Sequence, residues 1–226
     1  MTRIIGDIHG KWQEYKQIAT FDSNKESIQI GDFGIGFNGP FCHDRVNEFH
    51  SKQNHRSIRG NHDFPEKCKS DMVGYIPDGF VENDVMYIGG AWSIDHIYRT
   101  PGISWWEDEE CSVDEFNQII DIYTTVKPKI MITHDGPLDI TDRMFIQEGK
   151  AIGGKNAKSI LTKTGQALQA MYEIYQPEFW VFGHWHHDLI HKAEKTTFIC
   201  LGELTYIDLD FNTLEISKTN GEFDNV

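Results

Sequence analysis

The stretch Ile4-Ile5-Gly6-Asp7-Ile8-His9 joins a short apolar run to two side chains that commonly bind metals. Four further runs in the chain end in the same way. They are Ile28-Gln29-Ile30-Gly31 before Asp32, Ser57-Ile58-Arg59-Gly60 before Asn61-His62-Asp63, Ile130-Met131-Ile132-Thr133 before His134-Asp135, and Phe179-Trp180-Val181-Phe182-Gly183 before His184-Trp185-His186. Such runs are typical of buried strands, and in α/β folds these strands end at one edge, where ligands bind. The pattern predicts a divalent-metal cluster assembled from distant parts of the chain.

Each ending, taken alone, has an ordinary structural explanation. Asp7 and His9 lie two residues apart, which puts them on the same side of an extended strand, but a turn aspartate beside an incidental histidine would look the same. Gly31-Asp32 is a common turn dipeptide, and a lone histidine such as His134 is more often a hydrogen-bonded core residue. The joint occurrence of histidines at three strand ends with two Gly-Asp turns favours a dinuclear metal site.

The chemistry of these residue types narrows the choice of metal. One carboxylate can bridge two cations, while imidazoles and a neutral amide complete each coordination sphere without excess negative charge. Mixed nitrogen and oxygen ligands suit Mn²⁺, Fe, Zn²⁺ or Co²⁺ better than Mg²⁺ or Ca²⁺, and without a thiolate ligand a structural zinc site is not expected. We therefore expect two divalent transition-metal ions, with Mn²⁺ as the first candidate. Such a pair can hold a bridging hydroxide for in-line attack on a phosphoryl group.

Taken in order, these motifs resemble the metal-binding blocks of the calcineurin-like metallophosphoesterase superfamily. The blocks are Asp7-x-His9, Gly31-Asp32, Gly60-Asn61-His62-Asp63, His134 and Gly183-His184-x-His186, within residues 4–186. The resemblance implies an α/β fold: a two-sheet β-sandwich flanked by helices, in α/β/β/α layers. It also implies an enzyme that hydrolyses a small phosphomonoester or phosphodiester, nucleotides included.

The resemblance further implies a role for each residue of the blocks. One metal would be held by Asp7, His9, Asp32 and His186, and the other by Asp32, Asn61, His134 and His184. His62 would be the acid that faces the leaving group, and Asp63 would orient it.

The chain departs from the protein serine/threonine phosphatase branch of the superfamily. That branch usually has an Asp-Arg pair shortly after the second block, whereas here Phe33-Gly34-Ile35-Gly36 follows Asp32. Phosphoprotein phosphatase activity is therefore not expected. Arg59 does match the branch, which makes it a candidate contact for substrate phosphate. A buried structural role for Arg59 is an equally good interpretation.

A loop insertion is expected at residues 92–111, where no clear period is visible. It carries Arg99, Trp105 and Trp106, which are candidates for substrate binding because an arginine can clamp a phosphate and an aromatic ring can stack on a base. The alternative is that the tryptophans pack the loop onto the domain.

The acidic composition limits the partners that the chain can bind. Its 226 residues carry a formal net charge of −14, so the surface should repel a long polyanion, and sequence-independent binding of duplex nucleic acid is not expected. A small phosphorylated substrate is compatible, because bound cations reverse the charge locally. The rival activity is a nuclease or nucleic-acid end phosphatase, which the charge disfavours. A non-catalytic scaffold of the same fold would be expected to lose metal ligands, and none is lost.

Cysteine usage and hydropathy bear on the location of the protein. The four cysteines, Cys42, Cys68, Cys111 and Cys200, form no CxxC motif and are interpreted as reduced. A strand is expected directly after Met1, which argues against a secretory signal, and no apolar stretch approaches the ~20 residues of a membrane span. We therefore expect a cytoplasmic protein with one domain over residues 1–226 and no membrane association. The oligomeric state is left open.

The periodicity predicts β/α units followed by a run of strands. Strands are expected at 2–6, 27–31, 55–59, 85–90, 129–133 and 179–183, and helices at 11–20, 43–53, from Ser112 to before Pro128, and at 157–175. Ser112 and Glu115 form a capping-box pattern. Besides the insertion, loops are expected at 34–40 and 136–156, and a hairpin over 205–217 around Asn212.

Overall fold

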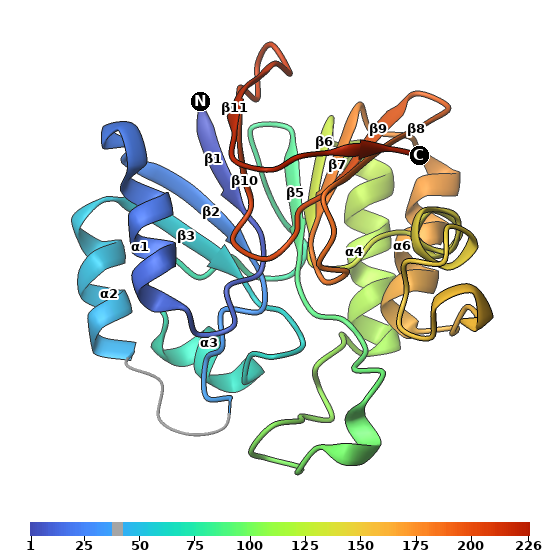
Figure 1. The fold of residues 1–226 in the computed structure, drawn as a ribbon, viewed down its shortest axis with the longest axis horizontal. Coiled ribbons are helices and arrows are strands. Elements are labelled where there is room, and N and C mark those ends of the chain that lie inside the picture. Colours follow the sequence, from blue (N-terminus) through green and yellow to red (C-terminus); the bar gives the residue numbers. More distant parts are fainter. Residues whose placement is uncertain (38–42) are drawn as a thin grey trace.

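The computed structural model describes residues 1–37 and 43–226, in which two mixed β-sheets pack against each other between flanking helices (Figure 1). Within these residues one sheet has five strands and the other has seven, and there are six α-helices. The predicted α/β class, with a two-sheet sandwich flanked by helices, is confirmed.

The five-stranded sheet is built mostly from the N-terminal part of the chain. Its order is β11 (Ile216–Thr219), β10 (Tyr206–Leu209), β1 (Thr2–Ile5), β2 (Glu26–Ile30) and β3 (Asn54–Ile58). β1, β2 and β3 run parallel, whereas β10 is antiparallel to β1 and β11 to β10. Helices α1 (Trp12–Thr20), α2 (His43–Lys52) and α3 (Pro65–Asp71) lie on its outer side (Figure 1).

The seven-stranded sheet holds the C-terminal half. Its order is β12 (Asp224–Asn225), β8 (Leu189–Ala193), β9 (Thr196–Cys200), β7 (Phe179–Phe182), β6 (Ile130–Thr133), β5 (Val85–Ile88) and β4 (Phe80–Glu82). Strands β5, β6, β7 and β9 are parallel neighbours, with antiparallel pairs at β4–β5 and β8–β9. Helices α4 (Val113–Val126) and α6 (Lys163–Ile174) cover its outer face (Figure 1).

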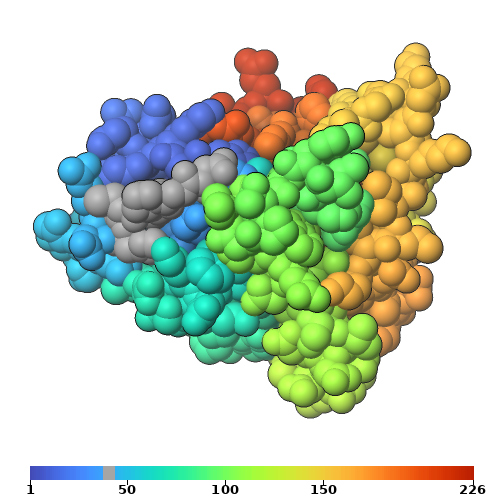
Figure 2. Space-filling model, turned by 90° about the horizontal axis from the view of Figure 1, so that it is seen from below, coloured from blue at the N-terminus to red at the C-terminus, as the bar shows by residue number. Residues whose placement is uncertain are grey.

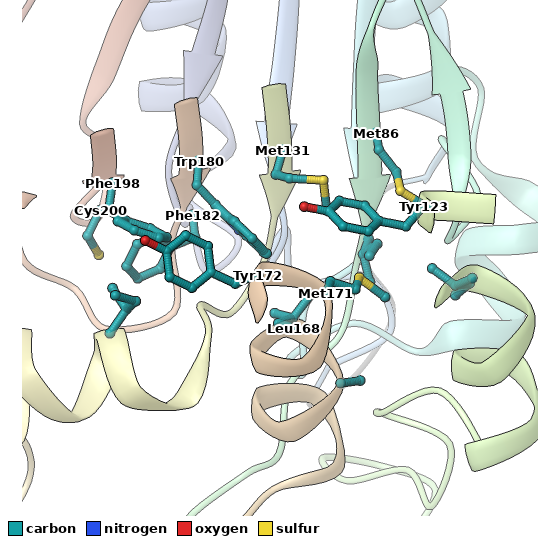
Figure 3. Close-up of a cluster of buried hydrophobic side chains, with 14 of the residues drawn as sticks. Met86, Tyr123, Met131, Leu168, Met171, Tyr172, Trp180, Phe182, Phe198 and Cys200 are labelled. Carbon is teal, nitrogen blue, oxygen red and sulfur yellow. The ribbon is translucent and has the colours of Figure 1, made fainter. Parts of the chain in front are cut away.

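Side-chain alternation along each strand creates the layers. In β6, Ile130 and Ile132 face the other sheet, whereas Met131 between them faces the helices. In β7, Val181 faces the other sheet, and Trp180 packs with α6 residues of the outer layer (Figure 3). Because successive strand residues point to opposite faces, continuous apolar strands supply both the sandwich interface and the layer under the helices. This burial on both faces holds the strand ends in fixed positions.

Most predicted elements are present with shifts of a residue or two. The Ser112 hydroxyl accepts from the Glu115 amide and the Glu115 carboxylate accepts from the Ser112 amide, so the capping box is confirmed. The expected hairpin is the antiparallel pair β10–β11. The insertion at 92–111 is a loop, apart from a short 3₁₀ helix at His96–Tyr98. Of the predicted loop at 34–40, residues 38–40 lie outside the described part of the chain.

The interpretation of 136–156 as a polar loop is wrong. Helix α5 (Leu138–Thr141) runs directly into a π-helix at Asp142–Gln147. Ile140, Met144 and Phe145 are buried in the layer beside α6. Tertiary burial of these apolar side chains outweighs the local polarity and the nearby Gly153-Gly154 that favoured a loop.

Helix α6 begins at Lys163, later than the predicted start at 157. The Thr162 hydroxyl caps it by accepting a hydrogen bond of 2.9 Å from the Gly165 amide, so residues 157–162 stay outside the helix. Helix α3 and strand β4 were not predicted; α3 begins with Pro65 in the first turn, where a missing N–H costs nothing.

Cys68, Cys111 and Cys200 are free and buried, as expected for reduced thiols, and Cys42 lies outside the described residues. Among the described helices, none is both long and apolar enough to cross a bilayer.

Candidate metal centre

The carboxyl ends of β1, β2, β3, β6 and β7 meet at one edge of the sandwich, the edge that also carries the insertion (Figure 1). Seen from that side, the insertion occupies the centre of the face, between the N-terminal segments and the segment around residues 140–190 (Figure 2). All seven predicted metal ligands come together here: Asp7, His9, Asp32, Asn61, His134, His184 and His186.

The seven side chains form two groups that share Asp32. In the first group, Nε2 of His186 lies 2.9 Å from Nε2 of His9 and 3.1 Å from Oδ2 of Asp7. The ligand atoms of these three residues and Asp32 all lie within 4.8 Å of one another. This is the set that the resemblance assigned to one metal.

The second group surrounds the Asn61 amide. Oδ1 of Asn61 lies 3.1 Å from Nε2 of His134 and 3.0 Å from Nδ1 of His184. Oδ1 of Asp32 lies 3.3 Å from the same His134 nitrogen. Four donor atoms of mixed nitrogen and oxygen type, each on a separate strand end, thus converge where the sequence predicted a second metal.

One observation, which does not depend on any resemblance, indicates that these donor atoms suit a divalent cation. Oδ2 of Asp7 is fully buried and has no hydrogen-bond partner among the described residues. Nε2 of His186 lies 3.1 Å from this oxygen and forms an ion pair with it only when the imidazole is protonated. A buried carboxylate oxygen without a partner is costly, and a cation between these donors would remove the cost.

The backbone at the site is strained in a way that aims side chains inward. His9, Asp32, His184 and His186 all adopt left-handed backbone conformations, with φ between 45° and 66°. Non-glycine residues rarely adopt this region, and such strain persists where a site requires it. At Gly60, a Cβ atom would collide with Oδ1 of Asp32, so glycine is needed for the backbone to pass the shared carboxylate.

The electrostatics of the metal-free chain are dominated by Asp32 and His134. Burial would raise the pKa of Asp32, but His134, His62 and His9 hold that pKa well below its usual value. Burial opposes a charge on His134, yet the Asp32 carboxylate raises the pKa of the imidazole to about 10. A metal ion at His134 would compete with a proton for the same nitrogen, so metal affinity should fall as the pH is lowered.

His62 stands beside the two groups, next to Arg99 of the insertion. Nη2 of Arg99 donates to Nε2 of His62 at 2.7 Å, so the neutral imidazole carries its proton on Nδ1. The ring stacks on Phe37 at 4.5 Å. Burial lowers the pKa of His62 to about 4, with Arg99 adding to the effect and Asp32 opposing it. In the free chain His62 is therefore neutral, and its ring accepts a hydrogen bond from the guanidinium of Arg99.

Asp63 has a different role from the orienting one that the resemblance implies. Its carboxylate accepts from the amides of Phe33, Gly34, Ile35 and Gly60, at 2.7–3.1 Å. These bonds tie the loop after Asp32 to the loop that carries Asn61. Asp63 therefore acts on the backbone of both loops, and none of its four described hydrogen bonds joins it to the imidazole of His62.

A hydrogen-bond network that the sequence did not reveal fixes the Asn61 amide. Nδ2 of Asn61 donates to Oγ of Ser93 at 3.0 Å, and Oγ of Ser93 donates to Oε2 of Glu109 at 2.5 Å. Arg99 Nη1 also donates to this hydroxyl, at 2.9 Å. With Nδ2 engaged by Ser93, Oδ1 of Asn61 must face His134, which is the orientation a metal ligand requires.

Replacing Ser93 with alanine should weaken metal binding without unfolding the chain. The Asn61 amide loses the partner that sets its orientation, and outer-shell partners of this kind typically contribute about 10–100-fold to metal affinity. Titration calorimetry with Mn²⁺ measures the effect. Ser93→Thr keeps a hydroxyl and should restore affinity, and Ser104→Ala removes another buried hydroxyl of the same insertion as a control. Unchanged affinity in Ser93→Ala would refute the positioning role.

Three of the predicted substrate-binding residues are not brought to the cavity beside the candidate metal ligands. Arg59 is only 2% exposed; its Nε donates to Asp78 at 3.0 Å and its Nη1 to the Glu109 carbonyl at 2.6 Å. Burial would lower the pKa of Arg59, but Asp78 raises it. This is the structural role that the sequence left open. Trp106 is buried and stacks on Phe64.

Among the described residues, those that line the cavity include Arg99 but not Arg59, Trp105 or Trp106. The cavity has a volume of about 520 Å³ and adjoins the candidate metal ligands, because Asp32, Asn61, His184 and His186 form part of its wall. Trp92, in the insertion, also lines it.

A comparison with protein families agrees with this geometry. Residues 2–188 match the family described as calcineurin-like phosphoesterase. The chain belongs to this family. No curated protein matches the chain in a sequence comparison.

Among solved structures, the chain is similar to one described as "Putative 5'-Nucleotidase from Staphylococcus aureus in complex with alpha-ketoglutarate". The sequence identity is 14% and the TM-score 0.50; the match covers 96% of this chain and 52% of that one. The chain thus spans about half the length of the structure it matches. At this identity the likeness supports the fold alone.

Proposed function

We propose that the protein is a metal-dependent phosphoesterase that hydrolyses a small phosphomonoester or phosphodiester. One observation carries the proposal: seven candidate metal ligands from five strand ends form two groups around a shared Asp32, and four of them line a cavity. Membership of the calcineurin-like phosphoesterase family supports the same activity.

The proposed metal ligands are the two groups found in the structure. Asp7, His9, Asp32 and His186 would hold one cation, and Asp32, Asn61, His134 and His184 the other. When bound, two such cations polarise the phosphoryl oxygens and lower the pKa of an attacking water. The mixed nitrogen and oxygen donors support Mn²⁺ as the first candidate, with Fe, Zn²⁺ or Co²⁺ as alternatives.

The chain itself supplies His62 and Arg99 at the cavity wall. In the free chain the guanidinium of Arg99 is bonded to His62 and pairs with Asp95 at 2.7 Å. An incoming phosphoryl group offers Arg99 a better anionic partner, and its negative charge favours protonation of His62. We propose that His62, once released by Arg99, donates a proton to the leaving oxygen.

Two alternatives have weaker support. A nuclease must accommodate an extended polyanion, which the net charge of −14 opposes. A non-catalytic scaffold would not need to keep a complete ligand set under backbone strain. A nucleotide fits the proposal as one small substrate among others, in keeping with the description of the structural neighbour. We also propose a cytoplasmic location, which the buried free thiols support.

The proposal is tested by hydrolysis of p-nitrophenyl phosphate and bis(p-nitrophenyl) phosphate. Chelation should abolish hydrolysis of whichever ester is turned over, and Mn²⁺ should restore it better than Ca²⁺. Retained activity after complete removal of metal would refute the proposed chemistry. Comparison of the two esters decides between monoesterase and diesterase.

A further inference from the structure

The far wall of the cavity is largely aliphatic. Leu138 and Ile146 line it from α5 and the π-helix, Ile152 and Ile160 from the following loop, and Ile94 from the insertion. These side chains come from two segments more than forty residues apart in the sequence. Both segments line the same cavity as the candidate metal ligands.

Three of these aliphatic side chains are exposed to solvent. Ile94 is 47% exposed, Ile152 78% and Ile160 41%. Single exposed apolar residues are common, but apolar residues gathered around one cavity mark a binding surface. Covering them with an apolar ligand would release the free energy of their hydration.

Several polar groups of this wall are engaged within the chain, whereas Lys158, which also lines the cavity, is exposed. The Asp142 carboxylate accepts from Ser159 and from Gln147. Lys150 pairs with Asp224 at 3.0 Å, and Nε1 of Trp185 donates to Asp135 at 2.9 Å. A ligand whose polar edge entered this part of the cavity would lose its hydrogen bonds to water and find these partners occupied, which is costly.

The wall is also preformed. The π-helix places Met144 and Phe145 in the core and leaves Ile146 facing the cavity. Phe145 stacks on Trp185 at 4.5 Å with the rings nearly parallel. π-helical turns are rare and frequently lie at functional sites. A volume of about 520 Å³ accommodates a small organic group beside the phosphoryl group.

We propose that this part of the cavity binds the apolar, uncharged organic group of the substrate. The substrate class is then a phosphate ester of an aliphatic or aromatic alcohol, with the phosphoryl group at the metal end and the organic group against Leu138, Ile146 and Ile160. This inference rests on the proposed phosphoesterase function and narrows its substrate.

A series of primary alkyl phosphates tests the proposal on the Mn²⁺-loaded protein. Methyl, butyl and octyl phosphate have leaving groups of similar basicity, so differences in kcat/KM report binding of the chain rather than the chemical step. Each buried methylene should raise kcat/KM about fourfold until the pocket is filled. Octyl phosphate is used below the concentration at which it forms micelles. A flat series, or a preference for nucleoside monophosphates over butyl phosphate, would overturn the proposal.

Two matched pairs of variants locate the effect. Ile94 and Ile160 line the cavity, whereas Ile97 and Leu161, of the same two segments, are exposed and do not line it. Ile94→Asn and Ile160→Asn should lower the gain per methylene, while Ile97→Asn and Leu161→Asn should leave it unchanged. All four side chains are exposed, so folding should survive each change. If all four variants lowered the gain in kcat/KM per methylene equally, the gain would come from surface hydrophobicity in general and not from this cavity.

Direct binding separates this inference from the proposed function. Calorimetry should show tighter binding of octylphosphonate, which cannot be hydrolysed, than of methylphosphonate, and Ile160→Asn should reduce the difference. If the loaded protein hydrolyses no ester, the proposed function fails, and the phosphonates alone decide the pocket. Equal affinity for the two phosphonates would overturn the apolar pocket even in an active enzyme.

Discussion

Replacing Asp32 with asparagine should lower phosphoester hydrolysis by more than about 100-fold, because loss of a shared ligand should exceed the effect of an outer-shell partner. Asp32 belongs to both ligand groups, and a neutral amide lacks the charge and the second anionic oxygen needed to bridge two cations. The His62 backbone amide donates to Asp32 at 2.7 Å, and in the variant it would donate to a neutral amide oxygen instead of a carboxylate. Initial rates at saturating Mn²⁺, with the metal content of the same sample, measure the effect.

A buried carboxylate elsewhere provides the control for Asp32→Asn. Asp208 pairs with Arg3 at 2.7 Å in the five-stranded sheet. Asp208→Asn should lower the melting temperature, because it leaves a buried guanidinium with a weaker partner, yet it should keep the metal content and the activity of the folded protein. An Asp32→Asn protein with unchanged metal content and rate would contradict the shared-ligand assignment.

The second large effect is expected for His62→Ala, and it should depend on the leaving group. General acid catalysis typically contributes ~10²–10⁴-fold. An alkoxide leaving group needs protonation, whereas p-nitrophenolate leaves as a stable anion. His62→Ala should therefore slow alkyl esters far more than nitrophenyl esters and retain its metals. Steady-state kcat values for both ester classes, in the same preparation, measure the difference.

The contact between His62 and Arg99 suggests an alternative role for His62, which is to bind the phosphoryl group together with Arg99. If the pair only binds the phosphoryl group, both ester classes should slow equally and KM should rise. Loss of a metal equivalent would instead make His62 a ligand. His96→Ala is a suitable control, because His96 belongs to the neighbouring insertion, contacts Trp92 and does not line the cavity. It should show no dependence on the leaving group.

The grouping of the candidate metal ligands was predictable from the sequence because coordination chemistry restricts residue identity at each position. Few side chains other than Asp, His and Asn can serve at a site like this, and parallel strands bring their ends to one edge. Short motifs such as Asp7-x-His9 and His184-x-His186 are therefore enough to predict metal ligands without knowledge of the rest of the fold. Apolar strand runs such as 130–133 were predictable for the same reason, since burial on both faces leaves a continuous apolar signature.

The parts that were missed depend on packing between segments distant in sequence. Ser93 and Glu109 lie sixteen residues apart and meet only because the insertion folds back on itself. Arg59 matched a phosphate-binding pattern, but the Asp78 carboxylate and the insertion's carbonyl groups enclose it. The π-helix at 142–147 has no local signature that distinguishes it from a loop, and Asp63 uses backbone amides whose positions no motif encodes.

Metal content after loading tests the central claim most directly. Metal-free protein is incubated with excess Mn²⁺, separated from unbound metal by gel filtration, and subjected to elemental analysis together with Asp32→Asn and Asp208→Asn. The proposed centre predicts close to two Mn²⁺ per chain in the unmodified protein and in Asp208→Asn, and a clear loss in Asp32→Asn. Fewer than one metal per unmodified chain would contradict the dinuclear centre, and with it the proposed phosphoesterase mechanism.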